Sequence, residues 1–261
     1  MCRAGGDFEM RLSAIVIAKN EERVIERCLR SLSFCDEILL IDSGSTDATH
    51  ALARACNATI IVEDWRGPAT QRNRGLDQAR GDWRLLLDAD EWISEELRDE
   101  ILSVVSRDPT ESAFRIPRLS SYCGRFMRHG GWWPDHVVRL IRRDGARFEG
   151  GIVHEHVVPK GPIGTLTRPL MHESFRDLDQ VLQKTNSYST WGAQDMIVAG
   201  KRSSLSAAIA HGLRAFIRTY DIRLGFLDGR HGLMLAISNA EGTYYRYAKA
   251  MLATSRGSTE K

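Results

Sequence analysis

The chain has 261 residues, a formal net charge of +2, and 43% hydrophobic against 27% charged residues, a balance typical of a folded globular protein and not of a disordered or fibrous one. No run reaches the ~20 consecutive apolar residues that a membrane-spanning helix needs, and residues 1–10 lack the apolar segment of a secretion signal. The five cysteines are scattered without Cys-x-x-Cys spacing, which predicts reduced thiols in a cytoplasmic protein.

Charge is distributed unevenly along the chain. Residues 1–159 carry 22 Lys+Arg against 26 Asp+Glu, and residues 160–261 carry 14 against 8, so the net charges are −4 and +6. The basic C-terminal third favours contact with an anionic surface, either phospholipid at the cytoplasmic membrane face or a phosphorylated substrate. A merely solvated face is the alternative, and no nucleic-acid partner is expected.

The first half of the chain alternates short apolar runs with amphipathic helical patterns. Asn20 is expected to cap the first helix and Ser94 the fourth. This βαβαβαβ order predicts a doubly wound, parallel sheet. The expected strands are residues 14–18, 38–41, 59–62 and 83–87.

Beyond residue 110 the pattern changes. Short strands are expected at 113–117, 137–142 and 146–148, the last two joined as a hairpin by the turn Asp144-Gly145. These strands predict mixed pairing at the sheet edge. Helical patterns follow Asp177 to the C terminus. We therefore expect two domains, residues 1–175 with the sheet and residues 176–261 as a helical extension packed on it.

Acidic and small polar residues close three of the predicted parallel strands. Asn20 follows the first, Asp42 ends the second, and Asp88-Ala89-Asp90-Glu91 ends the fourth. Because the carboxyl ends of parallel strands meet at one edge, where such sheets bind ligands, these side chains should share a crevice. Asp-x-Asp there offers carboxylate oxygens to a hard divalent cation, Mg²⁺ or Mn²⁺. An acid-rich solvated loop is the alternative.

Three segments, in this order, resemble the family 2 glycosyltransferases, which have the GT-A fold and use nucleotide-sugar donors. They are Ile15-Val16-Ile17-Ala18-Lys19-Asn20-Glu21-Glu22, Ile41-Asp42-Ser43-Gly44-Ser45-Thr46-Asp47 and Leu87-Asp88-Ala89-Asp90-Glu91. The resemblance covers residues 11–105. It is closest to the lipopolysaccharide core β-glucosyltransferases, because Arg139-Leu140-Ile141-Arg142-Arg143 and Val153-His154-Glu155 follow at comparable places. It implies a GT-A type α/β sheet with mixed edge strands, and a catalytic, nucleotide-sugar-binding role for residues 1–175.

The resemblance also implies roles for single residues. Asp90 would be the more direct ligand of the divalent ion that bridges the donor diphosphate, supported by Asp88. The late glutamine-and-tryptophan motif of processive enzymes is missing, which disfavours a polysaccharide synthase. The second strand ends in Asp42-Ser43, where many family members have two acids. The residues implied to hold the nucleoside or lie near the nucleotide are Ala18, Asn20, Glu22, Asp42, Arg72 and Asp88.

Glycosyl transfer also needs a base at the acceptor hydroxyl. If one carboxylate is that base and no enzyme nucleophile intervenes, the anomeric configuration inverts. The candidates are, in order, Glu155, Asp135 and Glu91, of which Glu91 could instead orient the acceptor. His154 is a candidate for contact with the metal or the diphosphate, against a structural role. The pair His172-Glu173 repeats His154-Glu155 and warns against treating either pair as a signature.

The main hypothesis is an inverting, metal-dependent glycosyltransferase (a hexosyltransferase) that moves a sugar from a UDP-sugar to a glycolipid or lipopolysaccharide-core type acceptor. It would act in the cytoplasm or peripherally at the cytoplasmic membrane face. A nucleotidyltransferase that makes a nucleotide sugar would need a Gly-rich loop after the first strand, and residues 18–22 contain no glycine. A non-catalytic nucleotide-sugar-binding scaffold is disfavoured, because crevice carboxylates are costly to keep without a use.

Overall fold

The computed structural model describes residues 11–150 and 156–256. The chain divides into two compact units. The sheet unit comprises residues up to 118 and residues 135–172, and the helical unit comprises residues 119–134 and those from 173 onward. The expected boundary after residue 175 lies close to the one after residue 172. The helical unit also includes residues 119–134, which the sequence analysis assigned to the first domain.

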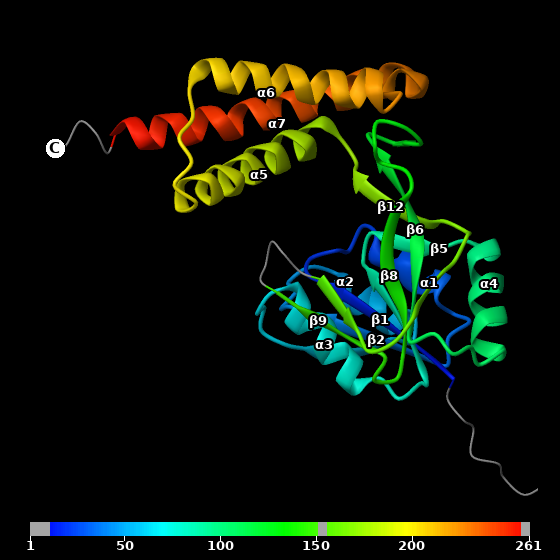
Figure 1. The fold of residues 1–261 in the computed structure, drawn as a ribbon. Helices are drawn as coiled ribbons and strands as arrows, with labels where there is room; N and C mark the ends of the chain where they lie inside the picture. The colour runs from blue at the N-terminus through cyan, green and yellow to red at the C-terminus, as the bar shows by residue number, and fades with distance from the viewer. Residues whose placement is uncertain (1–10, 151–155, 257–261) are drawn as a thin grey trace, which may run out of the picture. The chain divides into compact units, whose positions relative to one another are not determined.

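Within the described ranges, the main sheet has ten strands, eight of them in the order β3-β2-β1-β4-β8-β6-β12-β5, with β11 and β7 pairing to β6 (Figure 1). β1, β2, β3 and β4 are parallel, and β8 runs antiparallel to β4 and β6. The predicted α/β, mostly parallel sheet with mixed edge strands is therefore confirmed. The strands are β1 (Leu12–Ala18), β2 (Glu37–Asp42), β3 (Thr59–Val62), β4 (Trp83–Asp88), β5 (Glu91–Ile93), β6 (Ala113–Tyr122), β7 (Arg125–Phe126), β8 (Asp135–Arg142), β11 (Ile163–Thr165) and β12 (Leu170–Phe175).

Side chains alternate between the two faces of the central strands, and each face has its own apolar core. Val16 and Leu87 belong to the core under α1 (Ile25–Ser31), α2 (Thr49–Ala55) and α4 (Glu95–Ser106). Ile15 and Leu86 belong to the core under α3 (Pro68–Gln78). Gly75 on α3 is needed for that packing, because a Cβ there would lie 2.3 Å from Ile15 Cγ2. Helices thus cover both faces of the sheet (Figure 1).

The predicted side-chain cap at Ser94 is confirmed, and Asp177 caps the helix that follows it. Ser94 Oγ accepts the N–H of Leu97 at 3.3 Å, and Asp177 Oδ1 accepts the N–H of Gln180 at 2.9 Å. The predicted Asn20 cap is wrong, because α1 begins only at Ile25. Asn20 has a φ of 56° and makes its hydrogen bonds to a neighbouring loop instead.

The predicted hairpin at Asp144-Gly145 forms only its turn. The N–H of Gly145 donates to the carbonyl of Arg142 at 2.8 Å, so the chain reverses as expected. However, β8 pairs with β4 and β6, whereas β9 (Ala146–Glu149) pairs with β10 (His156–Pro159) in a separate two-stranded sheet. The turn residues fix the local reversal, but the strand partners are chosen by apolar burial on the main sheet.

The helical unit consists mainly of three long helices lying side by side, with short helical turns between the last two (Figure 1). α7 packs against both α5 and α6. Small residues allow the close approach, since a Cβ at Gly212 would lie 3.3 Å from the carbonyl oxygen of Ala240. None of the helices in the described ranges combines the length and apolarity needed to cross a bilayer. The helices are α5 (Leu178–Val198), α6 (Leu205–Ile217), η1 (Arg218–Ile222), η2 (Gly225–Asp228) and α7 (Gly229–Arg256).

Candidate active site

A cavity of about 310 Å³ lies at the carboxyl ends of the parallel strands. β1 pairs in parallel with β2 and with β4, so the ends of these strands meet at one edge of the sheet. Residues from all three strand ends line the cavity, together with side chains from more distant segments. Its lining includes Ala18, Ser43, Trp65, Asp88, Asp90 and His172.

Asp42, at the end of β2, is held inside the loop that follows. Its buried carboxylate accepts the N–H groups of Gly44 and Ser45 at 2.9 and 2.8 Å and the Ser45 hydroxyl at 2.5 Å, and lies 2.9 Å from His50 Nε2. Burial raises the pKa of Asp42, but these hydrogen bonds, Ser45 foremost, outweigh burial and hold the pKa below its ordinary value. Asp42 therefore fixes the loop, and the next residue, Ser43, lines the cavity.

Asn20 and Glu22 join the loop after β1 to the loop after β2. Asn20 Oδ1 accepts the N–H of Thr46 at 2.8 Å, and the Asn20 N–H donates to Ser45 Oγ at 2.8 Å. Glu22 Oε2 accepts the N–H of Ala48 at 3.0 Å. Both side chains thus position the loop beside the cavity. Ala18 contributes in a related way, because its carbonyl accepts the N–H of Ser43 at 3.0 Å.

Asp88, at the end of β4, lies between two arginines. Arg72 from α3 and Arg139 from β8 donate to its two carboxylate oxygens, at 2.6 and 2.5 Å. Burial alone would raise the pKa of Asp88 and lower that of Arg139. The charges of Arg139 and Arg72 outweigh burial and hold the pKa of Asp88 well below its ordinary value, and the charges of Asp88 and Glu91 raise that of Arg139. Both groups therefore stay charged.

Glu91 continues this chain of ion pairs. Its side chain is 0% exposed and accepts hydrogen bonds from Arg139 at 2.7 Å and from Arg118 at 3.2 Å. Its second oxygen accepts the N–H of Asp88 at 3.0 Å, which closes the turn of the motif. Arg118 donates in turn to Asp135 Oδ2, at 2.6 and 3.0 Å. We call this alternating series the arginine network; its members are Arg72, Asp88, Arg139, Glu91, Arg118 and Asp135.

Asp90 also lines the cavity, and within the described residues it is the acid of the motif without an arginine ion pair. Its side chain is 32% exposed, and its Oδ2 lies 3.4 Å from His172 Nε2. β12 pairs antiparallel with β5, so that His172 stands opposite Glu91 in the register and its ring reaches Asp90. Within the described ranges, no three His, Cys, Asp or Glu side chains gather into a ready-made metal site. The protein therefore offers two groups here, one carboxylate and one imidazole.

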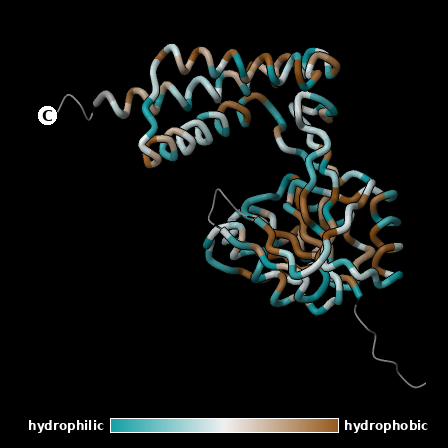
Figure 2. Tube along the Cα trace, in the orientation of Figure 1, coloured by the Kyte–Doolittle hydropathy of each residue, from teal (hydrophilic) through white to brown (hydrophobic). Residues whose placement is uncertain are grey.

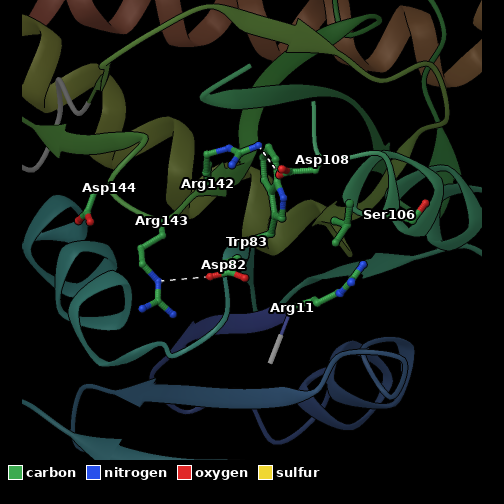
Figure 3. Close-up of a pocket in the computed structure, with 9 residues that line it drawn as sticks. Arg11, Asp82, Trp83, Ser106, Asp108, Arg142, Arg143 and Asp144 are labelled. Atoms are coloured by element: carbon green, nitrogen blue, oxygen red, sulfur yellow. Dashed lines mark hydrogen bonds and ion pairs between the residues drawn. The ribbon is translucent and has the colours of Figure 1, made fainter. Parts of the chain in front are cut away.

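A second cavity, of about 450 Å³, lies near the start of β4 and is lined by charged residues (Figure 3). Four of its charged residues form two ion pairs: Arg142 lies 2.6 Å from Asp108, and Arg143 lies 3.7 Å from Asp82. Figure 3 shows each pair joined by a dashed line. The cavity is at the amino end of β4, away from the motif acids, so its greater volume does not make it the active site.

Two predicted residues, His154 and Glu155, lie outside the described residues. The remaining predicted residues are all in the sheet unit. Residues 13–158 match the family model described as Glycosyl transferase family 2, which is more than half of the chain. The chain belongs to glycosyl transferase family 2. The predicted enzyme class is therefore confirmed, and the family replaces the nucleotidyltransferase and scaffold alternatives.

Relatives extend the likeness over nearly the whole glycosyltransferase. The lipopolysaccharide core biosynthesis glycosyltransferase LpsC of Rhizobium meliloti (strain 1021) is 32% identical over 259 residues, covering 92% of this chain and 94% of LpsC. The uncharacterized glycosyltransferase RT0209 of Rickettsia typhi is 30% identical, covering 92% and 86%. The structure of glucosyl-3-phosphoglycerate synthase from Mycobacterium tuberculosis with phosphoglyceric acid aligns at a TM-score of 0.49 and 19% identity, covering 66% of this chain and 74% of that one. The predicted likeness to the lipopolysaccharide core subgroup is confirmed by LpsC.

Sequence reasoning assigned no site role to several residues that the fold brings to this glycosyltransferase site. Arg118 and Arg139 form ion pairs with the motif acids. The sequence predicted the strands that contain them only as edge strands. His172 was set aside because its His-Glu pair repeats an earlier one, and it is the histidine that reaches Asp90. Trp65, 48% exposed, lines the cavity from a loop with no sequence signal. For Arg139, the available sequence signal was a single arginine within an otherwise apolar strand segment, residues 137–141.

Proposed function

We propose that this glycosyltransferase moves a sugar from a UDP-sugar to an acceptor of the lipopolysaccharide-core type, with inversion and with help from Mg²⁺ or Mn²⁺. One observation carries the proposal: Asp90 presents a carboxylate to the cavity beside His172, while Asp88 and Glu91 are both held by arginines. The site thus separates the acid that is available to a ligand from the acids that hold the motif in place.

The carboxylate of Asp90 fits a hard divalent cation. Mg²⁺ is typically bound by one or two protein groups together with substrate phosphates and water, not by a complete protein cage. Asp90 and His172 would supply the protein part of that shell, and the donor diphosphate the rest. When bound, such an ion neutralises the charge that grows on the leaving diphosphate. Asp88 supports the motif in this scheme, because both of its oxygens already accept from arginine.

Other cavity residues suit the rest of the donor. The ring of Trp65 offers a flat apolar surface to a nucleobase or a sugar face. Lys19 also lines the cavity and carries a positive charge near the expected diphosphate. The loop after β2, held by Asp42, Asn20 and Glu22, gives this wall a fixed shape.

For the acceptor base, Glu155 stays the first candidate. Asp135 is less suited, because its carboxylate oxygen Oδ2 already accepts two hydrogen bonds from Arg118, at 2.6 and 3.0 Å. Glu91 is less suited still, because its side chain is fully buried and held by two arginines. In the proposed reaction the base removes the hydroxyl proton as the acceptor oxygen attacks the anomeric carbon, and the bond to the diphosphate oxygen breaks.

The donor assignment is tested by thermal unfolding with a panel of UDP-sugars and Mn²⁺. A bound donor should raise the unfolding temperature through mass action. Asp90→Asn and His172→Asn should each remove the Mn²⁺-dependent part of the shift and abolish or strongly reduce transfer. Asp99→Asn, an exposed acid on α4, is the matched control. Full metal-dependent transfer by Asp90→Asn would sink the metal assignment, and a flat response to every UDP-sugar would sink the donor.

We also propose that the acceptor is met at an anionic membrane surface through α6. Four apolar side chains recur every four residues on this helix and are 42–59% exposed, while Ala208 and Gly212 face inward. Figure 2 shows the recurring hydrophobic turns. Lys201, Arg202, Arg214 and Arg218 are exposed next to them. An apolar stripe flanked by cations is the chemistry of a helix lying in a bilayer interface. The stripe is Leu205, Ile209, Leu213 and Ile217.

Vesicle flotation tests the membrane proposal. The protein should float with phosphatidylglycerol vesicles and much less with phosphatidylcholine vesicles, because the cations add to the apolar contact. The double substitution Ile209→Ser with Leu213→Ser should abolish flotation, and Val62→Ser, 60% exposed on β3, should not. If the stripe substitutions instead convert a dimer to a monomer in sedimentation, the stripe binds a second copy and the membrane proposal fails.

A further inference from the structure

The helical unit contains a cavity of its own, of about 350 Å³. It lies between α5 and α7 and is closed by residues 122, 132 and 175. All of the lining residues belong to the helical unit, so this cavity is separate from the donor site in the sheet unit. Its size is at the lower end of the ~300–1,000 Å³ range of small-molecule sites. The donor reaction proposed above makes no use of it.

One wall of the cavity is aromatic. The rings of Tyr122, Trp132 and Phe175 form a mutual cluster with centroids 5.8–6.0 Å apart. Polar groups are placed beside these rings: the Tyr122 hydroxyl lies 2.8 Å from Ser238 Oγ, and Asn239 also lines the space. Rigid aromatic faces with a few fixed hydroxyl and amide groups suit a sugar ring, which has apolar faces and polar edges.

The cavity lining also carries positive charge. Lys184 and Arg246 line the cavity, and its lining contains no Asp or Glu. Lys184 Nζ lies 4.8 Å from the Phe175 ring and donates to the Ser174 carbonyl at 3.1 Å. Arg246 Nε is buried without a hydrogen-bond partner in the described part of the chain. A buried donor on a cation is costly when unmatched, so an anionic ligand group would be stabilised here.

We propose that this cavity binds a phosphorylated saccharide, with the phosphate at Lys184 and Arg246 and the sugar ring on the aromatic wall. The identification of this ligand with part of the acceptor rests on the proposed function, whereas binding itself does not. The cavity would then recognise the acceptor at a place distinct from the bond being formed. Selectivity for phosphorylated over neutral acceptors follows from the unmatched cations.

Calorimetry on the full chain with glucose 6-phosphate tests the proposal. We expect binding that is unchanged by saturating UDP with Mn²⁺ and by Asp90→Asn, which separates this site from the donor site. Arg246→Gln and Lys184→Gln should each weaken binding at least tenfold, Arg246→Lys should restore part of it, and the exposed Arg230→Gln should leave it unchanged. If Arg246→Gln fails to fold by circular dichroism, Lys184→Gln decides.

Several outcomes would overturn the assignment. If glucose bound as tightly as glucose 6-phosphate, the cations would have no role in binding. If inorganic phosphate bound as tightly as glucose 6-phosphate, the saccharide would have no role. Competition by UDP would place the binding in the donor site. Binding of short-chain phosphatidylglycerol in place of glucose 6-phosphate would make the source a lipid headgroup. Failure of the UDP-sugar experiment with retained glucose 6-phosphate binding would sink the proposed donor and leave this site standing.

Discussion

The two units use arginine in opposite ways. In the sheet unit, each arginine of the arginine network is paired with at least one acid: Arg72 pairs with Asp88, Arg139 with Asp88 and Glu91, and Arg118 with Glu91 and Asp135. In the helical unit, Lys184 and Arg246 line a cavity that has no acid in its wall. Arginines paired with carboxylates stabilise the structure around a site. Cations without an acid in the cavity wall favour the binding of an anionic ligand. The comparison therefore distinguishes residues that stabilise a site from residues that bind a ligand.

Arg139 provides the largest test of this comparison. Its side chain is 5% exposed and bridges Asp88 and Glu91. Arg139→Met would leave both buried carboxylates without their shared partner, and breaking a buried ion pair in this way costs ~3–5 kcal/mol of unfolding free energy. Arg246→Met removes a cation that has no acid in its cavity wall, so it leaves no carboxylate of that wall unpaired and should cost less than Arg139→Met. Urea denaturation measures both, and equal losses would remove the distinction.

The sequence allowed the parallel half of the sheet to be predicted because its determinants are local. Each strand of this half is a short apolar run, and Thr59–Val62 matches the prediction residue for residue. The motif acids were found for the same reason, since strand-end carboxylates are visible in the chain itself. The Asn20 cap failed because its amide is used by the next loop, at Thr46. A local capping pattern contains no information about a hydrogen-bond partner in another loop that competes for the same side chain.

The partners of the motif acids could not be predicted in this way. Arg139 is 48 residues from Glu91 along the chain, and Arg118 is 27. They meet only because β8 and β6 join the sheet beyond β4, an order that no local pattern contains. His172 likewise reaches Asp90 through the pairing of β12 with β5. These contacts depend on strand partners, and strand partners depend on the burial of the whole sheet.

The base provides the second test, because the arginine network divides the candidate carboxylates. Glu155→Gln should lower kcat by about 10²-fold or more, the lower end of the usual contribution of a general base, with donor affinity unchanged. Asp135→Asn should have a much smaller effect, since Arg118 already holds that carboxylate, and Glu91→Gln should act mainly on stability. Single-turnover kinetics with separate donor titrations distinguish these. A larger loss from Asp135→Asn would reverse the ranking and place that end of the network in the chemistry.

The smallest effect expected is a difference in acid stability between the units. Among the described residues, the carboxyl groups whose pKa is held below the ordinary value all lie in the sheet unit: Glu37, Asp42, Asp47, Asp88 and Glu96. A carboxyl with a lowered folded-state pKa contributes stability above its unfolded pKa of about 4, and that stability is lost as the pH falls through the folded value. The sheet unit should therefore loosen first below about pH 4.

Hydrogen exchange followed by peptide mass spectrometry between pH 5 and pH 2, corrected for the intrinsic exchange rate, resolves the two units. Protection in β1, β2 and β4 should fall before protection in α5 and α7, because the carboxylates that stabilise the strand ends become protonated. Asp42→Asn should reduce the pH dependence of the sheet unit, since it removes one of the titrating groups with a lowered pKa, and Asp99→Asn, 68% exposed, should not. If α5 and α7 lose protection at a higher pH than the strands, carboxylates also stabilise the helical unit. The cations Lys184 and Arg246 would then have acidic partners, and the comparison between the units would fail.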